Sequence, residues 1–441
     1  MARPQLRRWL TDVREAELMP RLGRVAQFFG LVVESVGPDA FVGEMCQIHA
    51  KDRATPVNAE VLGLKDGKVL LMPYDELEGV SLGAQVVATG QSACTPVGAA
   101  LLGRVVNAFG VPLDGKPVVG RLEQYPLRPP PINPLERARV SDVLETGVRA
   151  IDCLFTLGRG QRVGIFAGSG VGKSTLLGMI ARNMSADVNV IALVGERGRE
   201  VRDFVEESLG PEGLKRSVVV AATSDQPALV RVRAAHAATA MAEYFRSQGL
   251  HAVLTMDSVT RYAMAQREIG LSIGEPATAR GYTPSVFAAL PRLLERGGIS
   301  ESGGSLTAIY TVLVEGDDLN DPVSDAVRAT LDGHISLSRT LANAGRFPAI
   351  DTLNSVSRLV RQLVPGEDLA TLQQTLRALS LYQASRDLID VGAYRAGVNP
   401  DLDQAVRWMP RLESFLTQAP GVMTPRKQAM QQLRSLLQQE R

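Results

Sequence analysis

The spacing of hydrophobic positions changes along the chain. From about residue 25 to 95, short β-rich runs such as "GLVVESVG" and "GAQVVATG" are separated by glycines and by turn signals such as "KDG". This pattern predicts the hairpins of a small barrel or sandwich. From about 140 to 360, strand-like runs such as "RVGIFAG", "NVIALVG" and "AVLTMD" alternate with longer helical patterns. That alternation predicts a mostly parallel sheet of the α/β class.

Two connecting segments interrupt these patterns, and the chain becomes helical towards its end. Residues 126–134, "PLRPPPINP", form a proline-dense connector that cannot be helical, and the glycine-rich stretch 296–305 predicts a loop before the next strand. After about residue 365, leucines recur three and four residues apart, which predicts helices. The last helix is expected to begin at "TPRKQAM", with Thr424 as its N-cap and Pro425 at its first position.

A short amphipathic helix is predicted ahead of the first domain, over residues 5–18. One face of that helix carries four apolar residues and one charged residue: Leu6, Trp9, Leu10, Val13 and Glu17. Two interpretations stay open, because the helix could pack on its own protein or dock a partner. Trp9 is a costly side chain to leave exposed without such a use.

Composition and charge narrow the class of protein. The 441 residues are 45% hydrophobic and 22% charged, and 48 basic against 47 acidic residues give a net charge of +1. This length suggests about two to four domains, and the charge balance argues against a nucleic-acid-binding surface.

Cys46, Cys94 and Cys153 show no CxxC spacing, which fits reduced thiols. The N-terminus lacks the apolar run of a signal peptide and no apolar stretch approaches about 18 residues, so we expect a soluble, intracellular protein.

The stretch "AGSGVGKST", residues 167–175, matches the phosphate-binding loop of nucleoside triphosphatases except at its first position. A strand, "RVGIF", leads in and an apolar helix, "STLLGMIARN", leads out, as the motif requires. Lys173 would reach the β- and γ-phosphates, and the Ser174 hydroxyl would ligate Mg²⁺. Ala167, in place of the first glycine, needs only a negative φ to be harmless. The predicted ATP-binding residues of this loop are Gly168, Ser169, Gly170, Val171, Gly172, Lys173, Ser174 and Thr175.

Acidic residues follow two other predicted strands. Asp257 ends "AVLTMD", where its carboxylate would emerge at the carboxyl edge of the sheet and act as the acidic residue that magnesium needs. An aspartate that caps the next turn is the alternative. Glu196 stands beside Arg197 in "IALVGERGRE" and could orient the attacking water. From spacing alone, a solvated charge cluster at a strand end explains Glu196 equally well.

Together these segments resemble a known family. "LVGERGREVRDF", "MDSVTRYAMAQREIGLSIGEPATARGYTPSVFAALPRLLER" and "AGRFPAIDTLNSVSRL" are similar to segments of the ATPases of type III protein export, which are relatives of the rotary ATP synthase subunits. The resemblance covers roughly residues 25–415. It implies an α/β fold with a RecA-like P-loop core, an N-terminal small β-barrel and a C-terminal helical domain. The expected domains are a partner-docking helix (1–22), the barrel (23–95), the ATPase domain with its connector 126–134 (96–365) and the helical domain (366–441).

The resemblance assigns catalytic roles to residues that follow the strands. Glu196 matches the family's catalytic carboxylate, and Arg197 beside it matches an arginine of the nucleotide site. Asp257 matches the acidic residue of the magnesium-binding strand, which is expected to contact Mg²⁺ through a bound water, and Arg261 follows at the family's position. Lys173 completes this set as the lysine of the phosphate loop.

The resemblance also assigns residues that the spacing alone would leave unremarked. Arg358, in "NSVSR", matches the arginine finger that acts in trans on the nucleotide of a neighbouring subunit. Such a finger is typically worth about 10³–10⁵ in rate. Phe347 matches the aromatic side chain that packs against adenine, and a phenylalanine keeps the stacking face. Tyr394 is a candidate for a second aromatic side chain at adenine.

The same resemblance implies an assembly and its partners. We expect a homohexameric ring at the cytoplasmic face of the inner-membrane export gate, with Mg²⁺ as cofactor, ATP as substrate and only peripheral attachment to the membrane. A stator-like regulatory partner would bind the N-terminal helix. A central coiled-coil stalk protein would pass the pore loop 274–287, which includes Tyr282. Hydrolysis would be coupled to the engagement, chaperone release and unfolding of export substrates, with no role for nucleic acid.

Alternatives to this function remain. "LEGVSLGAQV" and "LLGRVVNAFGVPLDG" favour the flagellar branch of the family, and the ATPase of a virulence-type injectisome is the alternative within it. A hexameric RNA helicase or translocase joins a similar barrel to this core, but the near-neutral charge and the weak aromatic–basic pattern of residues 25–95 argue against it. A non-catalytic rotary subunit usually lacks the carboxylate, which is present here as Glu196.

Overall fold

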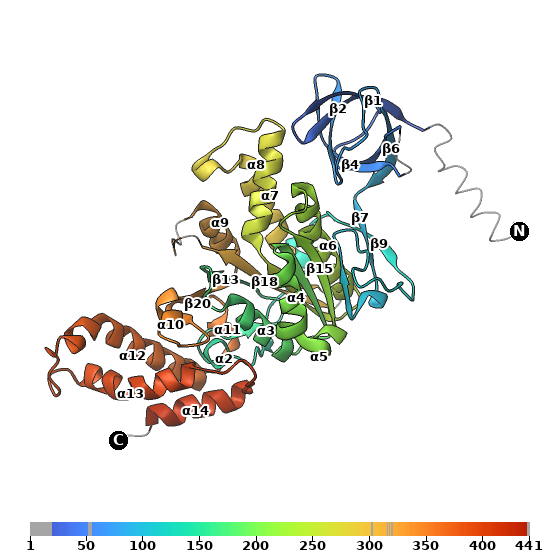
Figure 1. Ribbon diagram of the computed structural model, residues 1–441. Coiled ribbons are helices and arrows are strands. Elements are labelled where there is room, and N and C mark those ends of the chain that lie inside the picture. Colours follow the sequence, from blue (N-terminus) through green and yellow to red (C-terminus); the bar gives the residue numbers. More distant parts are fainter. Residues whose placement is uncertain are drawn as a thin grey trace, which may run out of the picture. The chain divides into compact units, whose positions relative to one another are not determined.

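The structure is a computed structural model that describes residues 20–51, 55–300, 303–314, 316, 318 and 321–438. The helix predicted over residues 5–18 lies outside this part of the chain. The described residues form an N-terminal barrel unit and a second unit, which starts at Cys94 and contains the nucleotide-binding motif. Figure 1 shows the elements of each unit along the chain.

The N-terminal unit is a closed antiparallel barrel, as the hairpin pattern predicts, with neighbouring strands in the order β1-β2-β5-β4-β3-β6. Val33, Ile48 and Leu71 point into it and are fully buried. The "KDG" turn joins β4 to β5, where Asp66 and Gly67 have φ of 50° and 73°, the left-handed pair of a two-residue type I′ hairpin. The strands are β1 (Leu22–Phe29), β2 (Val32–Val36), β3 (Glu44–His49), β4 (Val57–Lys65), β5 (Lys68–Pro73) and β6 (Gln85–Ser92).

The second unit is built on a large sheet in the order β20-β19-β13-β18-β16-β14-β15-β8. From β19 to β8 the neighbouring strands run parallel, and β20 pairs antiparallel with β19. The predicted α/β class is therefore confirmed. Parallel strands end at the same edge, so the residues that follow β13, β14 and β16 meet there. The strands are β8 (Arg104–Val106), β13 (Arg162–Ala167), β14 (Val188–Glu196), β15 (Ser217–Thr223), β16 (His251–Asp257), β18 (Ser305–Leu313), β19 (Gly333–Leu337) and β20 (Ile350–Ser357).

Smaller strands and connecting helices complete this sheet. The stretch 296–305 was expected to be a loop, which is wrong in part, because Gly298–Ser300 forms strand β17 and pairs with β10 and β18. The helices are α2 (Arg149–Leu154), α3 (Lys173–Asn183), α4 (Gly198–Asp203), α5 (Gly210–Lys215), α6 (Ala228–Ser247), α7 (Val259–Ser272), α8 (Pro284–Leu294), α9 (Pro322–Thr330), α10 (Arg339–Asn343) and α11 (Val360–Leu363). The short strands are β7 (Cys94–Val97), β9 (Glu123–Pro126), β10 (Arg137–Ala138), β11 (Val143–Leu144) and β12 (Leu157–Gly158).

The chain ends in the predicted helical domain, drawn in orange to red in Figure 1. It consists of α12 (Gly366–Asp390), α13 (Pro400–Leu416) and α14 (Arg426–Gln438) in the described part of the chain. Leu372 and Leu379, two of the leucines that predict it, are buried. The helices share one hydrophobic core with α2, α3 and β13. None of the helices within the described residues is long and apolar enough to cross a membrane.

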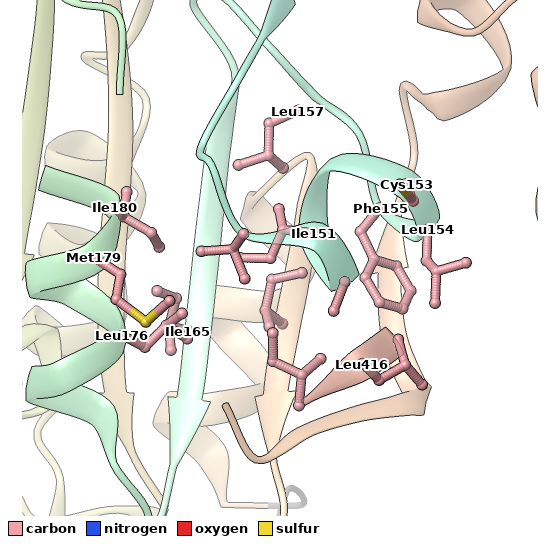
Figure 2. Close-up of a cluster of buried hydrophobic side chains, with 14 of the residues drawn as sticks. Ile151, Cys153, Leu154, Phe155, Leu157, Ile165, Leu176, Met179, Ile180 and Leu416 are labelled. Atoms are coloured by element: carbon pink, nitrogen blue, oxygen red, sulfur yellow. The ribbon is translucent and has the colours of Figure 1, made fainter. Parts of the chain in front are cut away.

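That shared core fixes the helix that carries the phosphate loop. Figure 2 shows Leu176, Met179 and Ile180 of α3 beside Ile165 of β13, and Leu416 of α13 below Leu154 and its neighbours in α2. All of these side chains are at most 2% exposed. Burying each of them contributes about 1.5–3 kcal/mol. The start of α3 is therefore held firmly against the strand that leads into it.

Candidate functional site

The phosphate loop connects the end of β13 to the start of α3, as predicted. Gly170 and Gly172 have φ of 77° and 88°, in the left-handed region where a side chain is disfavoured. The described non-glycine residues with positive φ are Asp66 and Arg280, so Ala167 has a negative φ and its methyl group causes no strain. Gly168 and Val171 are buried, whereas Ser169, Gly170, Ser174 and Thr175 are exposed at the mouth of the loop.

Lys173, Asp257 and Glu196 come together at the carboxyl edge of the sheet. The Lys173 ammonium lies 2.5 Å from Oδ1 of Asp257 and 3.6 Å from Oε1 of Glu196. All three side chains are largely buried, with 12%, 5% and 13% of their surface exposed. Their burial argues against a solvated surface charge for either acid, and their roles at magnesium and water stay predictions.

Burial raises the pKa of the Glu196 carboxyl into the range suited to a general base. Desolvation raises the pKa of Glu196 to about 7, and the neighbouring carboxylates of Glu200 and Asp257 add to the shift while Lys173 opposes it. A carboxyl with a pKa near the working pH is suited to accept a proton from water. Gly195, directly before it, has φ of 72°, and a Cβ there would lie 2.9 Å from Cβ of Arg261. Only glycine lets β14 end in this way.

Arg197 lies away from the buried cluster within the single chain. Its side chain is 82% exposed and forms an ion pair of 3.5 Å with Glu200 across the first turn of α4. The predicted contact of Arg197 with nucleotide therefore stays a prediction.

Phe347 lies against the phosphate loop. A Cβ placed on Gly172 would be 3.4 Å from the Phe347 ring, so the ring borders the glycine directly before α3. Phe347 is 42% exposed, and its backbone oxygen accepts a hydrogen bond from the Gln418 backbone N–H at 2.8 Å. An exposed aromatic face beside the phosphate loop can stack on a nucleotide base.

Tyr394 does not share that location. Its hydroxyl donates to Asp403 in the first turn of α13 at 2.6 Å, whereas Phe347 contacts Gln418 just beyond the other end of this helix. The fifteen residues from Asp403 to Gln418 correspond to about 20 Å of helix. The structure therefore does not bring Tyr394 to the same site as Phe347.

Arg358 lies at the opposite, amino edge of the sheet, directly after β20. Its backbone N–H donates to the Asp332 carbonyl at 3.0 Å, and the Asp332 carboxylate binds Arg162, the first residue of β13, at 2.9 Å. The phosphate loop follows the other end of β13, about 16 Å away at 3.3 Å per residue. Arg358 is therefore too far from Lys173 to act on a nucleotide held by its own chain.

The residues present fit a nucleotide-bound Mg²⁺ ion. Within the described residues, histidine, cysteine, aspartate and glutamate form no cluster of three or more that could hold a metal by themselves. Magnesium bound with a nucleotide needs only one or two protein ligands, because phosphates and waters supply the rest. Ser174 offers an exposed hydroxyl next to Lys173, and Asp257 offers a carboxylate beside the same lysine.

Residues that the sequence did not single out also take part. The Thr311 hydroxyl, on β18, donates to Oδ1 of Asp257 at 2.7 Å. Arg339 donates to the backbone oxygen of Ser169 in the phosphate loop at 3.2 Å. Thr311 looks like an ordinary strand residue in "LTAIYTVLV", and only the neighbouring strands β13 and β16 reveal its position.

This geometry defines the class of the protein, a P-loop ATPase of the RecA-like type. Three family models match successive parts of the chain. They are the beta-barrel domain of the ATP synthase alpha/beta family at residues 25–90, the nucleotide-binding domain of that family at 147–357, and the T3SS EscN ATPase C-terminal domain at 364–435.

Relatives narrow the class to one family. The chain is 54% identical to the flagellum-specific ATP synthase of Bacillus subtilis over 90% of this chain and 91% of that protein. It is 46% identical to the type 3 secretion system ATPase of Xanthomonas euvesicatoria over 94% of each. The assembled ATPase EscN of enteropathogenic E. coli matches in structure with a TM-score of 0.89 and 42% identity, covering 94% of this chain and 100% of that chain. The chain belongs to the family of flagellar and type III secretion export ATPases, and these relatives do not favour the helicase alternative.

Proposed function

We propose that this chain is the Mg²⁺-dependent ATPase of a flagellar protein-export apparatus and that it works as a homohexameric ring. The observation that carries the proposal is the placement of the cluster of Lys173, Glu196 and Asp257 at one sheet edge and of Arg358 at the other. A heterologous, head-to-tail interface brings such opposite edges of two copies together, and a closed ring repeats it. Each nucleotide then lies between two subunits.

Each side chain has a defined task in this proposal. Lys173 binds the β- and γ-phosphates, and Phe347 stacks on adenine. Glu196 orients the attacking water and accepts its proton, and Arg358 of the neighbouring copy neutralises charge that develops on the γ-phosphate. Ser174 would hold Mg²⁺ directly and Asp257 through water, and the ion would supply positive charge at the phosphates. Arg197 completes the nucleotide site once a second subunit covers it.

The remaining partners belong to the same proposal. One solved relative is described as the assembled ATPase EscN in complex with its central stalk EscO, which supports a stalk protein passing the loop 274–287. A stator-like partner at residues 1–22, an export gate, chaperones and secreted substrates complete the assembly at the cytoplasmic face of the inner membrane. The domain boundaries 23–95, 96–365 and 366–441 remain part of this proposal.

The flagellar assignment rests on the flagellar relatives of Bacillus subtilis and Salmonella typhimurium, at 54% and 50% identity. The Xanthomonas secretion ATPase is 46% identical, within the 45–54% range of the flagellar relatives. A chromosomal Lys173→Ala replacement in the source organism tests this assignment. We expect the cells to make flagellar filament protein but to stop exporting it and to lose motility. Normal motility with loss of another secreted set of proteins would assign the chain to an injectisome instead.

A further inference from the structure

Thr311 is a fully buried hydroxyl on β18, the strand that lies between β13 and β16. It stands opposite Ile165 of β13, three residues before the phosphate loop begins at Gly168. On its other side lies Asp257, the last residue of β16. The hydroxyl thus sits between the strand of the phosphate loop and the strand of the predicted magnesium carboxylate.

The Thr311 hydroxyl makes one strong hydrogen bond. It lies 2.7 Å from Oδ1 of Asp257 and 3.4 Å from the Met256 carbonyl. A hydroxyl carries one proton, so Thr311 donates it in the shorter, charge-assisted hydrogen bond to Asp257. Threonine is branched at Cβ and holds a restricted χ1 in a strand, which keeps the hydroxyl in place.

The carboxylate of Asp257 is held unevenly. Oδ1 accepts from both Lys173, at 2.5 Å, and Thr311, at 2.7 Å. Oδ2 accepts no hydrogen bond from the described residues. One oxygen is therefore fixed by two donors, and the other is left for a ligand such as a metal-bound water.

This arrangement matters because Lys173 has two tasks. In the proposed function, on which the inference rests, Lys173 turns to the phosphates of bound ATP. Asp257 Oδ1 then loses one of its two donors, and Thr311 is the remaining one. Without it, the carboxylate would be free to rotate about its side-chain torsions.

We propose that Thr311 is a positioning residue, which holds the Asp257 carboxylate in the orientation that serves Mg²⁺ while Lys173 binds phosphate. It touches neither nucleotide nor metal. Its effect is on the metal dependence of nucleotide binding, and the affinity for nucleotide without metal does not depend on it. Loss of a partner that orients a metal ligand typically costs about 10–100-fold in metal affinity.

The test is a titration of the full-length protein with Mg²⁺ in the presence of a fluorescent, non-hydrolysable ATP analogue. For Thr311→Val we expect the Mg²⁺ concentration at half-maximal tightening to rise about 10–100-fold, with unchanged affinity in EDTA. Thr311→Ser keeps the hydroxyl and should titrate like the wild type. Thr307→Val is the matched control, since it removes another buried hydroxyl from β18, about 13 Å along the same strand.

Two results would overturn the inference. If Thr311→Val titrates like the wild type while Asp257→Asn is shifted, Asp257 serves the metal but Thr311 does not position it. If Asp257→Asn is also unshifted, the metal assignment in the proposed function fails, and the inference falls with it. Should the valine variant not fold, Thr311→Cys repeats the test with a weaker donor.

Discussion

The two edges of the central sheet differ in the functional groups that they carry within one chain. At the carboxyl edge, Lys173, Glu196 and Asp257 are largely buried, and both carboxylates lie within 3.6 Å of the Lys173 ammonium. At the amino edge, the exposed Arg358 side chain contacts the Arg328 carbonyl at 3.3 Å and pairs with no carboxylate in the described part of the chain. The first edge can bind a nucleotide and polarise water by itself. The second carries an exposed cation that can meet an anionic group of another molecule.

Removing Arg358 should have the largest effect that leaves binding intact. We expect Arg358→Ala to lower the rate of ATP hydrolysis by about 10³–10⁵-fold, because the γ-phosphate loses its trans cation. Affinity for a fluorescent ATP analogue should stay close to that of the wild type. Arg361→Ala, an exposed arginine three residues further on, is the control and should remain active. Full turnover in Arg358→Ala would contradict the proposal that Arg358 acts on the nucleotide of a neighbouring subunit.

Glu196→Gln tests the carboxyl edge in the same way. The amide cannot accept a proton, and we expect steady-state hydrolysis to fall by about 10²–10⁴-fold. Glu207→Gln, an exposed side chain of the π-helical segment Phe204–Leu209, serves as the control. An active Glu196→Gln enzyme would assign the base to another group.

The pH profile sharpens this prediction. Because burial raises the pKa of Glu196 to about 7, the carboxyl is mostly protonated below pH 7, and kcat/KM should fall about tenfold per pH unit there. The raised pKa also means that this carboxyl stabilises the folded state at low pH and that this stability is lost as pH rises through about 7. Glu196→Gln should therefore not lower thermal stability at pH 8. A marked loss of stability would contradict the assigned pKa direction.

Phe347→Ala should have a moderate effect, confined to nucleotide affinity. Loss of the stacking face is worth about 0.5–1.5 kcal/mol, so we expect KM for ATP to rise up to about tenfold with little change in kcat. Phe347→Tyr keeps the ring and should behave like the wild type. An unchanged KM in the alanine variant would show that adenine does not stack on Phe347.

The smallest effect is expected for Tyr394. Since its hydroxyl binds Asp403 at the far end of α13 from the Phe347 contact, Tyr394→Ala should leave KM for ATP unchanged. A rise as large as that for Phe347→Ala would show that Tyr394 reaches adenine after all.

Local signals made the carboxyl edge predictable. Strand, glycine loop and helix follow one another in "RVGIFAGSGVGKST", and the strand ends at Glu196 and Asp257 are visible in the hydrophobic pattern. The "KDG" hairpin was predictable for the same reason, because its turn chemistry lies within three residues. What depends on strand order was not predictable. Thr311 becomes important only because β18 lies between β13 and β16, and the strand at 298–300 forms by pairing with β10 and β18.

The position of Arg358 shows the same limit. The resemblance to a family suggested its role, but only the antiparallel pairing of β20 with β19 places it at the amino edge. Hydrophobic spacing cannot show whether a strand runs parallel or antiparallel to its neighbour. The exposure of the Arg197 side chain likewise depends on the direction that α4 takes after the end of β14. The charge of Arg197 alone does not determine that direction.

The most direct test of the shared site mixes two inactive variants. Lys173→Ala retains Arg358, and Arg358→Ala retains Lys173, so an interface between one copy of each can be complete. In randomly mixed rings, about a quarter of the interfaces would combine the two intact halves. We therefore predict that an equimolar mixture recovers about that share of wild-type ATP turnover. A mixture as inactive as its two components would contradict the claim that one site is built from opposite edges of two subunits.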